Sequence, residues 1–292
     1  MYELIQVTPS CCYVDCPAKV GLVLTGESEA VLIDSGSDKD AAKKVLRALQ
    51  ETGRSLKAVF LTHSHADHSG GCKLLRDRTG CAVYAPGVDA SVVSNPILEP
   101  SMLYGGFPPD ALRNKFLMAS ACPALPLTEA ALPDGLAAVP LPGHCYDMVG
   151  FRSADGVVYL ADCLSSRETL DKYGLAYNYD IAACLETLER VKTMAGRVFV
   201  PAHAEATENI APLAQYNIDC ILSACERLLS LCREPVCFDL LLKKLFDSYG
   251  LTLSFQQYAL VGSTVRSYLA YLLKQGRAEY LFSENTMLWH SV

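Results

Sequence analysis

The chain of 292 residues lacks the features that direct a protein to a membrane, a nucleic acid or a disulfide framework. No stretch of about 18 mainly apolar residues is free of charge, which excludes a membrane-spanning helix. The formal net charge of −7 gives no attraction to nucleic acid or to an anionic membrane surface. The thirteen cysteines include no Cys-x-x-Cys pair, so a zinc ribbon or a thioredoxin-type site is unsupported.

A secretory signal is also missing. Residues 1–6 have neither the basic start nor the apolar core that such a signal needs. An odd number of cysteines without export indicates free thiols in a reducing compartment. We therefore expect a cytoplasmic protein.

Histidine is scarce, but half of it is concentrated in one short run. Only six histidines occur, and three of them lie in Thr62-His63-Ser64-His65-Ala66-Asp67-His68. The run directly follows the apolar, strand-like residues 56–61. Imidazole and carboxylate groups that converge on one loop are the ligands that zinc and similar divalent cations use. The run therefore predicts a metal site.

Two further histidines and one aspartate follow other apolar stretches. His144 ends the segment 141–144, Asp162 follows the strand-like residues 157–160, and His203 ends the segment 200–203. Positions just past the ends of strands meet at a sheet edge, so we expect these side chains in one cleft with the histidine run.

The motif His-x-His-x-Asp-His, followed by His, Asp and His further along the chain, resembles the signature of the metallo-β-lactamase-fold hydrolases. The resemblance covers about residues 1 to 205. It implies an α+β fold, in which an αββα sandwich of two mixed β-sheets is flanked by helices. We expect this catalytic domain at residues 1–206, with a small helical domain at 207–292.

The resemblance also implies a dinuclear metal site. Three residues would bind a first metal, three others would bind a second metal, and one residue would bridge the two. In that order they are His63, His65 and His144; Asp67, His68 and His203; and Asp162. Asp34, at the end of the apolar residues 31–33, matches an early aspartate that orders the ligand loop.

Such ligands imply a water-activating centre. We expect two divalent cations, zinc first and iron or manganese as alternatives, about 3.5–4 Å apart with a bridging hydroxide as nucleophile. Asp67 and Asp162 are candidates to assist proton transfer, although both are also expected metal ligands. Cys145 and Cys163 directly follow expected ligands, and buried packing is favoured over a nucleophilic role for both.

The spacing of apolar residues along the chain predicts the positions of strands and helices. Strands are predicted near 2–7, 18–25, 29–33, 56–61, 81–84, 136–140, 148–153, 156–160 and 197–200. Helices are predicted near 38–52, 69–78 and 180–195.

Residues 86–127 interrupt this rhythm with several prolines and glycines. A loop of that length in a compact domain is usually functional, so we expect a lid or pocket wall over the metals. Its candidate substrate contacts are Tyr104, Arg113 and Lys115. Tyr173, Tyr177 and Tyr179, which follow Asp162, are candidates for a second wall.

The C-terminal residues predict helices near 211–233, 238–249, 255–261 and 262–275, followed by a hairpin over 278–290. This order resembles a winged helix. Acidic residues outnumber basic ones in 207–292, so packing, shaping of the cleft or homodimerisation is favoured over sequence-specific nucleic-acid binding.

Together these features favour a hydrolase of a small-molecule ester or thioester, in the manner of glyoxalase II. A ribonuclease or phosphodiesterase is an alternative with the same fold, as is a mononuclear iron dioxygenase acting on persulfides. A non-enzyme alternative is a metal-containing sensor or nucleic-acid-binding protein. The complete set of ligand positions argues against this last alternative.

Overall fold

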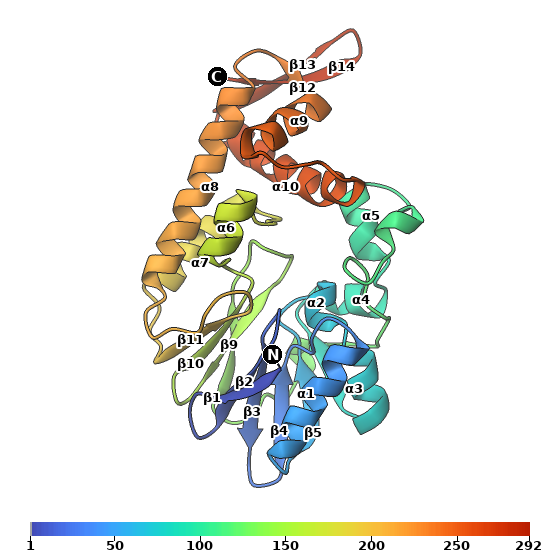
Figure 1. The fold of residues 1–292 in the computed structure, drawn as a ribbon, viewed down its shortest axis with the longest axis vertical. Coiled ribbons are helices and arrows are strands. Elements are labelled where there is room, and N and C mark those ends of the chain that lie inside the picture. Colours follow the sequence, from blue (N-terminus) through green and yellow to red (C-terminus); the bar gives the residue numbers. More distant parts are fainter. Residues whose placement is uncertain (1) are drawn as a thin grey trace.

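Two mixed β-sheets lie face to face in the N-terminal two thirds of the chain (Figure 1). The computed structural model describes residues 2–292. In the first sheet the strand order follows the chain, with β1 to β4 antiparallel and β4 to β7 parallel. Its strands are β1 Glu3–Gln6, β2 Cys11–Asp15, β3 Val20–Thr25, β4 Glu29–Ile33, β5 Ser55–Phe60, β6 Ala82–Ala85 and β7 Leu125–Pro126.

The second sheet has the order β11-β10-β9-β8, in which only β10 and β11 are parallel. Its strands are β8 Leu136–Pro140, β9 Val149–Ser153, β10 Val157–Ala161 and β11 Val198–Pro201. Every residue of β10 is buried, which explains its unbroken apolar sequence. The predicted pair of mixed sheets is confirmed. Strand β2 was not predicted.

Aromatic side chains fill the space between the sheets. Phe60 of β5 and Phe151 of β9 have ring centroids 6.0 Å apart. The hydroxyl of Tyr159 crosses to the first sheet and donates to the carbonyl oxygen of Cys12 at 2.8 Å. Gly21 makes room for that ring, because a Cβ there would lie 2.8 Å from it. These contacts fix the position of one sheet against the other.

Helices cover the outer faces of both sheets and complete the αββα sandwich (Figure 1). Helices α1 Lys39–Glu51, α2 Ala66–Ser69 and α3 Cys72–Thr79 belong to the side of the first sheet. Helices α6 Arg167–Tyr173, α7 Ile181–Lys192 and α8 Ala211–Leu231 belong to the side of the second. Helix α6 was not predicted.

The helix predicted over 69–78 is α3, and the end of the histidine run before it, predicted as a loop, forms the short helix α2. The chain turns at Gly70 and Gly71, which pass against the main chain of the loop after β4. A Cβ on Gly70 would lie 2.1 Å from the carbonyl oxygen of Ser37. The close approach of two backbones therefore separates the two helices.

The C-terminal residues form two further helices and a three-stranded sheet of order β12-β14-β13. The elements are β12 Val236–Cys237, α9 Phe238–Tyr249, α10 Phe255–Lys274, β13 Ala278–Ser283 and β14 Thr286–Ser291. The break predicted at Gly262 is wrong, because α10 runs through it. One glycine lowers helix stability by only about 1 kcal/mol, and the buried Val265, Tyr268 and Leu269 outweigh that.

The insertion 86–127 contains short helices and is not one uninterrupted loop. It contains α4 Asp89–Ser94, α5 Leu98–Tyr104 and a 3₁₀ turn at Asp110–Leu112. Leu103, Leu112 and Leu117 pack against Ala259 of α10. The insertion therefore rests on the C-terminal helices, as the meeting of α5 and α10 in Figure 1 shows.

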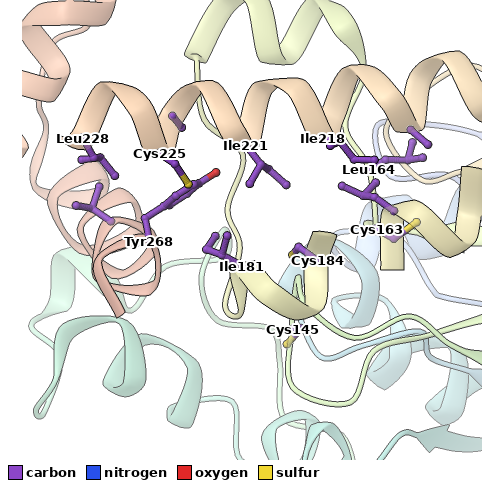
Figure 2. Close-up of a cluster of buried hydrophobic side chains, with 14 of the residues drawn as sticks. Cys145, Cys163, Leu164, Ile181, Cys184, Ile218, Ile221, Cys225, Leu228 and Tyr268 are labelled. Carbon is purple, nitrogen blue, oxygen red and sulfur yellow. The ribbon is translucent and has the colours of Figure 1, made fainter. Parts of the chain in front are cut away.

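One hydrophobic core runs across the expected boundary at residue 206. Figure 2 shows Ile221 and Cys225 of α8 beside Ile181 of α7 and Tyr268 of α10. The same cluster reaches Leu160 of β10 in the second sheet. The C-terminal helices thus share their core with the sandwich.

All thirteen cysteines are free, and eleven of them are buried. Within residues 2–292, no helix combines the length and the apolar character needed to cross a membrane.

Candidate metal centre

The expected ligands lie where strands of the two sheets end. Asp34 follows β4, His63 comes shortly after β5, and Asp162 and His203 follow β10 and β11. Both strand pairs, β4–β5 and β10–β11, are parallel, so their carboxyl ends open at the same edge. The histidine run itself forms the turn into α2.

Three imidazoles form a first group. One nitrogen from each of His63, His65 and His144 lies within 4.8 Å of the other two. Nε2 of His63 and Nε2 of His144 each approach Nδ1 of His65 at 3.0 Å. Three imidazole nitrogens that face one point could hold a divalent cation of the zinc type.

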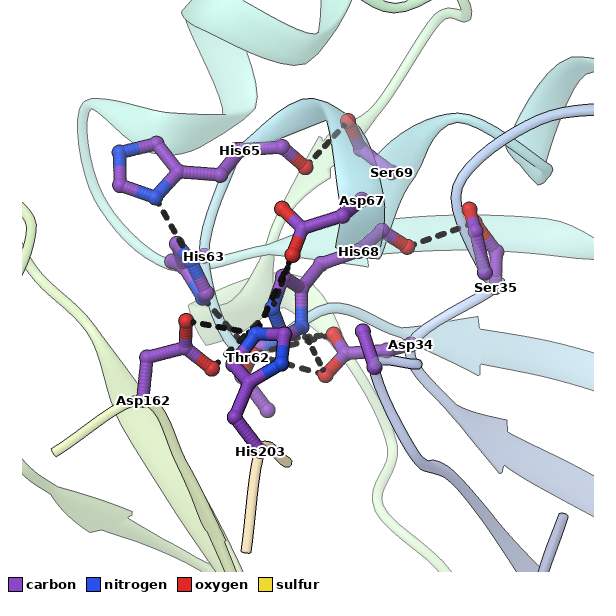
Figure 3. Close-up of polar contacts among 12 residues, drawn as sticks. Asp34, Ser35, Thr62, His63, His65, Asp67, His68, Ser69, Asp162 and His203 are labelled. Carbon is purple, nitrogen blue, oxygen red and sulfur yellow. Dashed lines mark hydrogen bonds and ion pairs between the residues drawn. The ribbon is translucent and has the colours of Figure 1, made fainter. Parts of the chain in front are cut away.

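Two carboxylates and two imidazoles form a second group, shown in Figure 3. Nε2 of His203 lies 3.2 Å from Asp67 and 3.1 Å from Asp162, and Nε2 of His68 lies 3.1 Å from Asp162. Asp162 also reaches towards the first group, with its Oδ2 3.6 Å from Nε2 of His144. Asp162 therefore stands in reach of both groups, where the resemblance expects a bridging carboxylate.

The remaining ring nitrogens are held by the protein. Nδ1 of His144 donates to the carbonyl oxygen of Tyr177 at 3.0 Å, and Nδ1 of His203 donates to that of Pro17 at 2.8 Å. Because a carbonyl oxygen only accepts, these bonds put the proton on Nδ1 and leave Nε2 as the free lone pair. Nδ1 of His68 is paired with Asp34 at 2.9 Å in the same way.

Asp34 fixes the conformation of the loop that carries the histidine run. Its carboxylate accepts the main-chain N–H of Thr62 at 2.8 Å and the Thr62 hydroxyl at 2.9 Å, besides the contact with His68. The Thr62 hydroxyl in turn lies 3.0 Å from Nδ1 of His63. Both Asp34 and Ala161 have positive φ, 68° and 51°. This left-handed backbone conformation at the ends of β4 and β10 turns the chain towards the site.

Burial and charge set opposite protonation preferences in the two groups. Burial lowers the pKa of His65 to about 3 with help from His144, and burial lowers those of His63 and His144 too. The carboxylate of Asp162 raises the pKa of His203 to about 10 against its burial. Burial alone would lower the pKa of His68, but Asp162, Asp67 and Asp34 raise it well above its usual value. The first group is neutral, whereas the second attracts positive charge.

The donor set fits divalent cations. Nε2 of His68 and Oδ1 of Asp162 are buried with no hydrogen-bond partner among residues 2–292, although they lie 3.1 Å apart. Buried polar atoms without partners are costly, and a cation ligated by both would satisfy them. Imidazole with carboxylate is the ligand type that zinc, iron and manganese share.

Asp89 is a residue of the site that sequence reasoning missed. Its fully buried carboxylate accepts the N–H of Ser64 at 2.8 Å and the N–H of Asp147 at 3.3 Å. Ser64 lies between His63 and His65, and Asp147 lies just after His144. Asp89 therefore joins the two loops that supply the first group. No local signal marks it, since it stands in the insertion, well beyond the histidine run.

Glu99 of α5 is a second such residue. Only 7% of it is exposed, and burial, with Asp67 and Asp89 adding repulsion, raises its pKa well above the usual value. Burial thus favours the neutral form of this carboxyl group.

A cavity of about 500 Å³ opens on the candidate ligands. His144, Asp162 and His203 line one part of it, and Tyr177 lines it too. The Tyr177 ring packs edge-on against His65 and His144, at 5.3 Å and 5.4 Å between centroids. Of the six candidates, Tyr173 and Tyr177 are the two that the structure places in this cavity.

The other four candidates lie elsewhere. Tyr104 packs on Phe255, and Tyr179 packs on Tyr146. Arg113 forms an ion pair with Asp110, and Lys115 forms one with Asp38. Protein carboxylates thus already neutralise both cations that were proposed for an anionic substrate.

Cys145 and Cys163 pack in the core, as Figure 2 shows. Burial raises the pKa of both thiols, which disfavours the thiolate that a nucleophile needs. The favoured interpretation of buried packing is confirmed.

Fold and site define an αββα protein with two adjoining His/Asp groups at the sheet edge. The chain belongs to the metallo-beta-lactamase superfamily, whose family model matches residues 14–203. The resemblance seen in the sequence is therefore confirmed.

Curated relatives match in part. A hydroxyacylglutathione hydrolase from Albidiferax ferrireducens is 42% identical over 60 residues, which make up 20% of this chain and 22% of that protein. The similarity thus spans about a fifth of the relative's length. A beta-lactamase-like protein 2 homolog from Drosophila melanogaster is 26% identical over 205 residues, 68% of this chain and 62% of that protein.

Solved structures share the fold over nearly the whole chain. A metallo-beta-lactamase family protein from Thermus thermophilus has a TM-score of 0.71 at 18% identity. The alignment covers 99% of this chain and 97% of that protein. A beta-lactamase domain protein from Burkholderia ambifaria has a TM-score of 0.75 at 16% identity, covering 99% and 94%. Since both alignments cover 99% of this chain, the likeness in fold includes the C-terminal helices.

Proposed function

We propose that the protein is a metal-dependent hydrolase of a small-molecule ester or thioester. The observation that carries this proposal is the cavity of about 500 Å³ into which His144, Asp162 and His203 project. A substrate held there would place its carbonyl group beside both His/Asp groups.

The ligand residues would divide as the two groups do. His63, His65 and His144 would hold one divalent cation, and Asp67, His68 and His203 a second, with Asp162 between them. Bound cations would supply Lewis acidity, which lowers the pKa of a water and polarises a carbonyl oxygen. Zinc is our first choice, and iron and manganese suit the same ligands.

Other residues of the chain would orient the substrate and transfer protons. The Tyr177 ring packs against the rings of His65 and His144 and would limit the directions from which a substrate can enter. Asp67, whose side chain is 43% exposed, is the carboxylate that reaches the open side of the site. It is therefore the residue best placed to receive a proton from an attacking water and pass it to solvent. Asp162 also lines the cavity, but its side chain is only 10% exposed.

Two observations favour a carbonyl ester over a phosphodiester. Several matching relatives are named hydroxyacylglutathione hydrolases, which points to a thioester. Apart from the candidate metal ligands, no charged side chain of residues 2–292 lines the cavity, whereas a phosphodiester needs positive charge around its phosphate.

The test begins with metal content. Protein purified without chelator or added metal is analysed by elemental mass spectrometry and then assayed on p-nitrophenyl acetate, an acetyl thioester, bis-p-nitrophenyl phosphate and single-stranded RNA. Two cations per chain with ester or thioester turnover support the proposal. Turnover of the phosphodiesters alone would refute it, and one iron per chain with oxygen uptake on persulfides would favour the dioxygenase.

The C-terminal segment, 207–292, is proposed to be a winged-helix-like unit. The order α8, β12, α9, α10, β13, β14 supports that comparison. Its outer hairpin exposes Phe282 by 68% and Tyr280 by 50%, and β13 is an edge strand. We propose that this edge pairs with a second copy to form a homodimer. Light scattering on the intact protein and on Phe282→Ser tests this, and a monomer at all concentrations would refute it.

A cytoplasmic location is also proposed, because thirteen free and mostly buried thiols suit a reducing compartment. Fractionation of the source cells, followed by detection of the protein, tests it.

A further inference from the structure

The C-terminal helices build one wall of the cavity at the metal centre. Leu245 and Phe246 of α9, Leu251 in the following loop, and Leu260 and Val261 of α10 line it. These residues lie far along the chain from the His/Asp motif. The segment after residue 206 therefore contributes directly to the space in which a substrate would lie.

Charge is missing from this lining. Among the lining residues, all of which fall within the described part of the chain, the acidic and basic side chains are those of Asp162, His144 and His203. The other polar groups are neutral, such as those of Thr169 and Gln257. An ionic substrate group would lose its hydration there without gaining an opposite charge. The walls therefore suit an apolar group.

We infer that the substrate carries an apolar acyl chain, which lies in this cavity against α9 and α10. This inference rests on the proposed ester or thioester hydrolysis and names its substrate class. The thiols of biological thioesters carry phosphate or carboxylate groups, which the uncharged walls would not accept. The acyl side of the substrate therefore occupies the cavity, and the leaving group points to solvent.

The cavity has the size of a small-molecule site, which is typically about 300–1,000 Å³. In the reaction the acyl C–S or C–O bond breaks. The hydroxyl group of water joins the acyl carbon, and the second water proton goes to the leaving thiol or alcohol. The C-terminal helices take no part in these bonds, so their effect is on acyl-chain specificity.

The first experiment is a chain-length profile on the metal-loaded full-length protein. The probes are N-acetylcysteamine thioesters with acetyl, butanoyl, hexanoyl and octanoyl groups. Each buried methylene should raise kcat/KM by up to about fourfold until the cavity is filled. A flat or falling profile overturns the inference while acetyl turnover still supports the proposed function. No turnover of any ester or thioester refutes the proposed function itself.

The second experiment fills the cavity. Val261→Phe should lower kcat/KM for the octanoyl thioester at least tenfold more than it lowers kcat/KM for the acetyl thioester. Leu251→Phe, on a loop, gives an independent reading if the helix variant does not fold. Leu273→Phe is the matched control, because Leu273 lies on the same helix and is 38% exposed outside the cavity. Leu273→Phe should leave kcat/KM for both thioesters unchanged.

A third series separates the two ends of the substrate. Acetyl thioesters of ethanethiol, butanethiol and octanethiol vary the leaving group at constant acyl length. Val261→Phe should change kcat/KM for all three members of this series by the same factor. If it instead lowers turnover of the octanethiol ester alone, the leaving group occupies the cavity and the acyl assignment is wrong.

Discussion

The buried carboxylate of Asp89 accepts the main-chain N–H of Ser64 at 2.8 Å. Ser64 separates two imidazoles of the first His group, and the second carboxylate oxygen of Asp89 holds the N–H of Asp147, beside the third imidazole. One side chain from α4 therefore sets the distance between the β5 loop and the β8 loop. The arrangement of the first group depends on a residue that binds no metal.

Replacing Asp89 should weaken the first metal site selectively. Asp89→Ala leaves the N–H groups of Ser64 and Asp147 buried without partners, and we expect a loss of about 10- to 100-fold in affinity for one of two cations. Asp89→Asn keeps one carbonyl oxygen and should lose less. Titration with a competing chromophoric chelator measures both affinities. Asp134→Ala, at an exposed aspartate, is the control, and wild-type affinity in Asp89→Ala would contradict the prediction.

Loss of a ligand should remove activity without unfolding the protein. His65→Ala and Asp162→Ala should each lower hydrolysis by at least about a hundredfold and reduce the bound metal below two per chain. His290→Ala is the matched control, because this histidine lies in the C-terminal hairpin beside Glu279. Turnover close to wild type in either ligand variant, with a normal circular dichroism spectrum, would refute the two-metal assignment.

Removal of metal should lower the melting temperature. The carboxylates of Asp67 and Asp162 lie close together and are held by His68 and His203, so a cation at the second group relieves repulsion as well as filling a site. A cation at a hundredfold excess over its Kd stabilises the folded state by about 2.7 kcal/mol. Calorimetry of chelator-treated protein, alone and with zinc, iron or manganese added back, measures this. An equal melting temperature in all four samples would exclude metal binding.

Glu99 should make stability fall as pH rises. Its folded-state pKa is raised above the usual 4.5, mainly by burial. The unfolded chain therefore releases this proton at a lower pH than the folded protein does. The contribution to stability is complete below pH 4.5 and is lost as the pH rises through the folded pKa.

Glu99→Gln removes this ionisation and keeps the shape of the side chain. The variant should melt at a higher temperature than wild type at about pH 8, with the difference shrinking towards pH 4.5. Melting curves of the metal-loaded proteins over this range provide the measurement. Glu129→Gln, at an exposed position, should show no such trend. A difference that is constant with pH would show that Glu99 does not titrate as argued.

Gly70 should tolerate no side chain. Its φ of −61° suits alanine, so the effect of a substitution is one of space alone. The added Cβ would lie 2.1 Å from the carbonyl oxygen of Ser37, which forces α2 and the His68 that it carries to move. Gly70→Ala should therefore lower both the melting temperature and the metal content, whereas Gly106→Ala, whose added Cβ would lie 4.0 Å from the nearest atom, should change neither. Calorimetry and elemental mass spectrometry on the two variants check this.

The sequence predicted most of the sandwich because its strands are short, apolar and separated by clear turns. It failed where distant parts of the chain meet. Gly70 and Gly71 separate α2 from α3 through contact with residues 35 and 37, and Gly262 does not break α10 because the helix is packed. Neither effect has a local signal.

The His/Asp residues could be found from the sequence because metal ligands must be of few chemical types at fixed spacings. Which residues surround a substrate could not be found in this way. Arg113 and Lys115 were reasonable candidates by charge, but Asp110 and Asp38 pair with them in the folded protein.

The sequence by itself thus determined the set of candidate His/Asp ligands and the αββα framework, since both follow from residue type and local order. Only the tertiary structure decided that Asp89 ties the ligand loops together and that Val261, far along the chain, borders the same cavity as His144. The physical reason for the second case is that the core shared by α7, α8 and α10, against which Val261 packs, brings α10 to the cavity. Such packing depends on contacts that no single segment specifies.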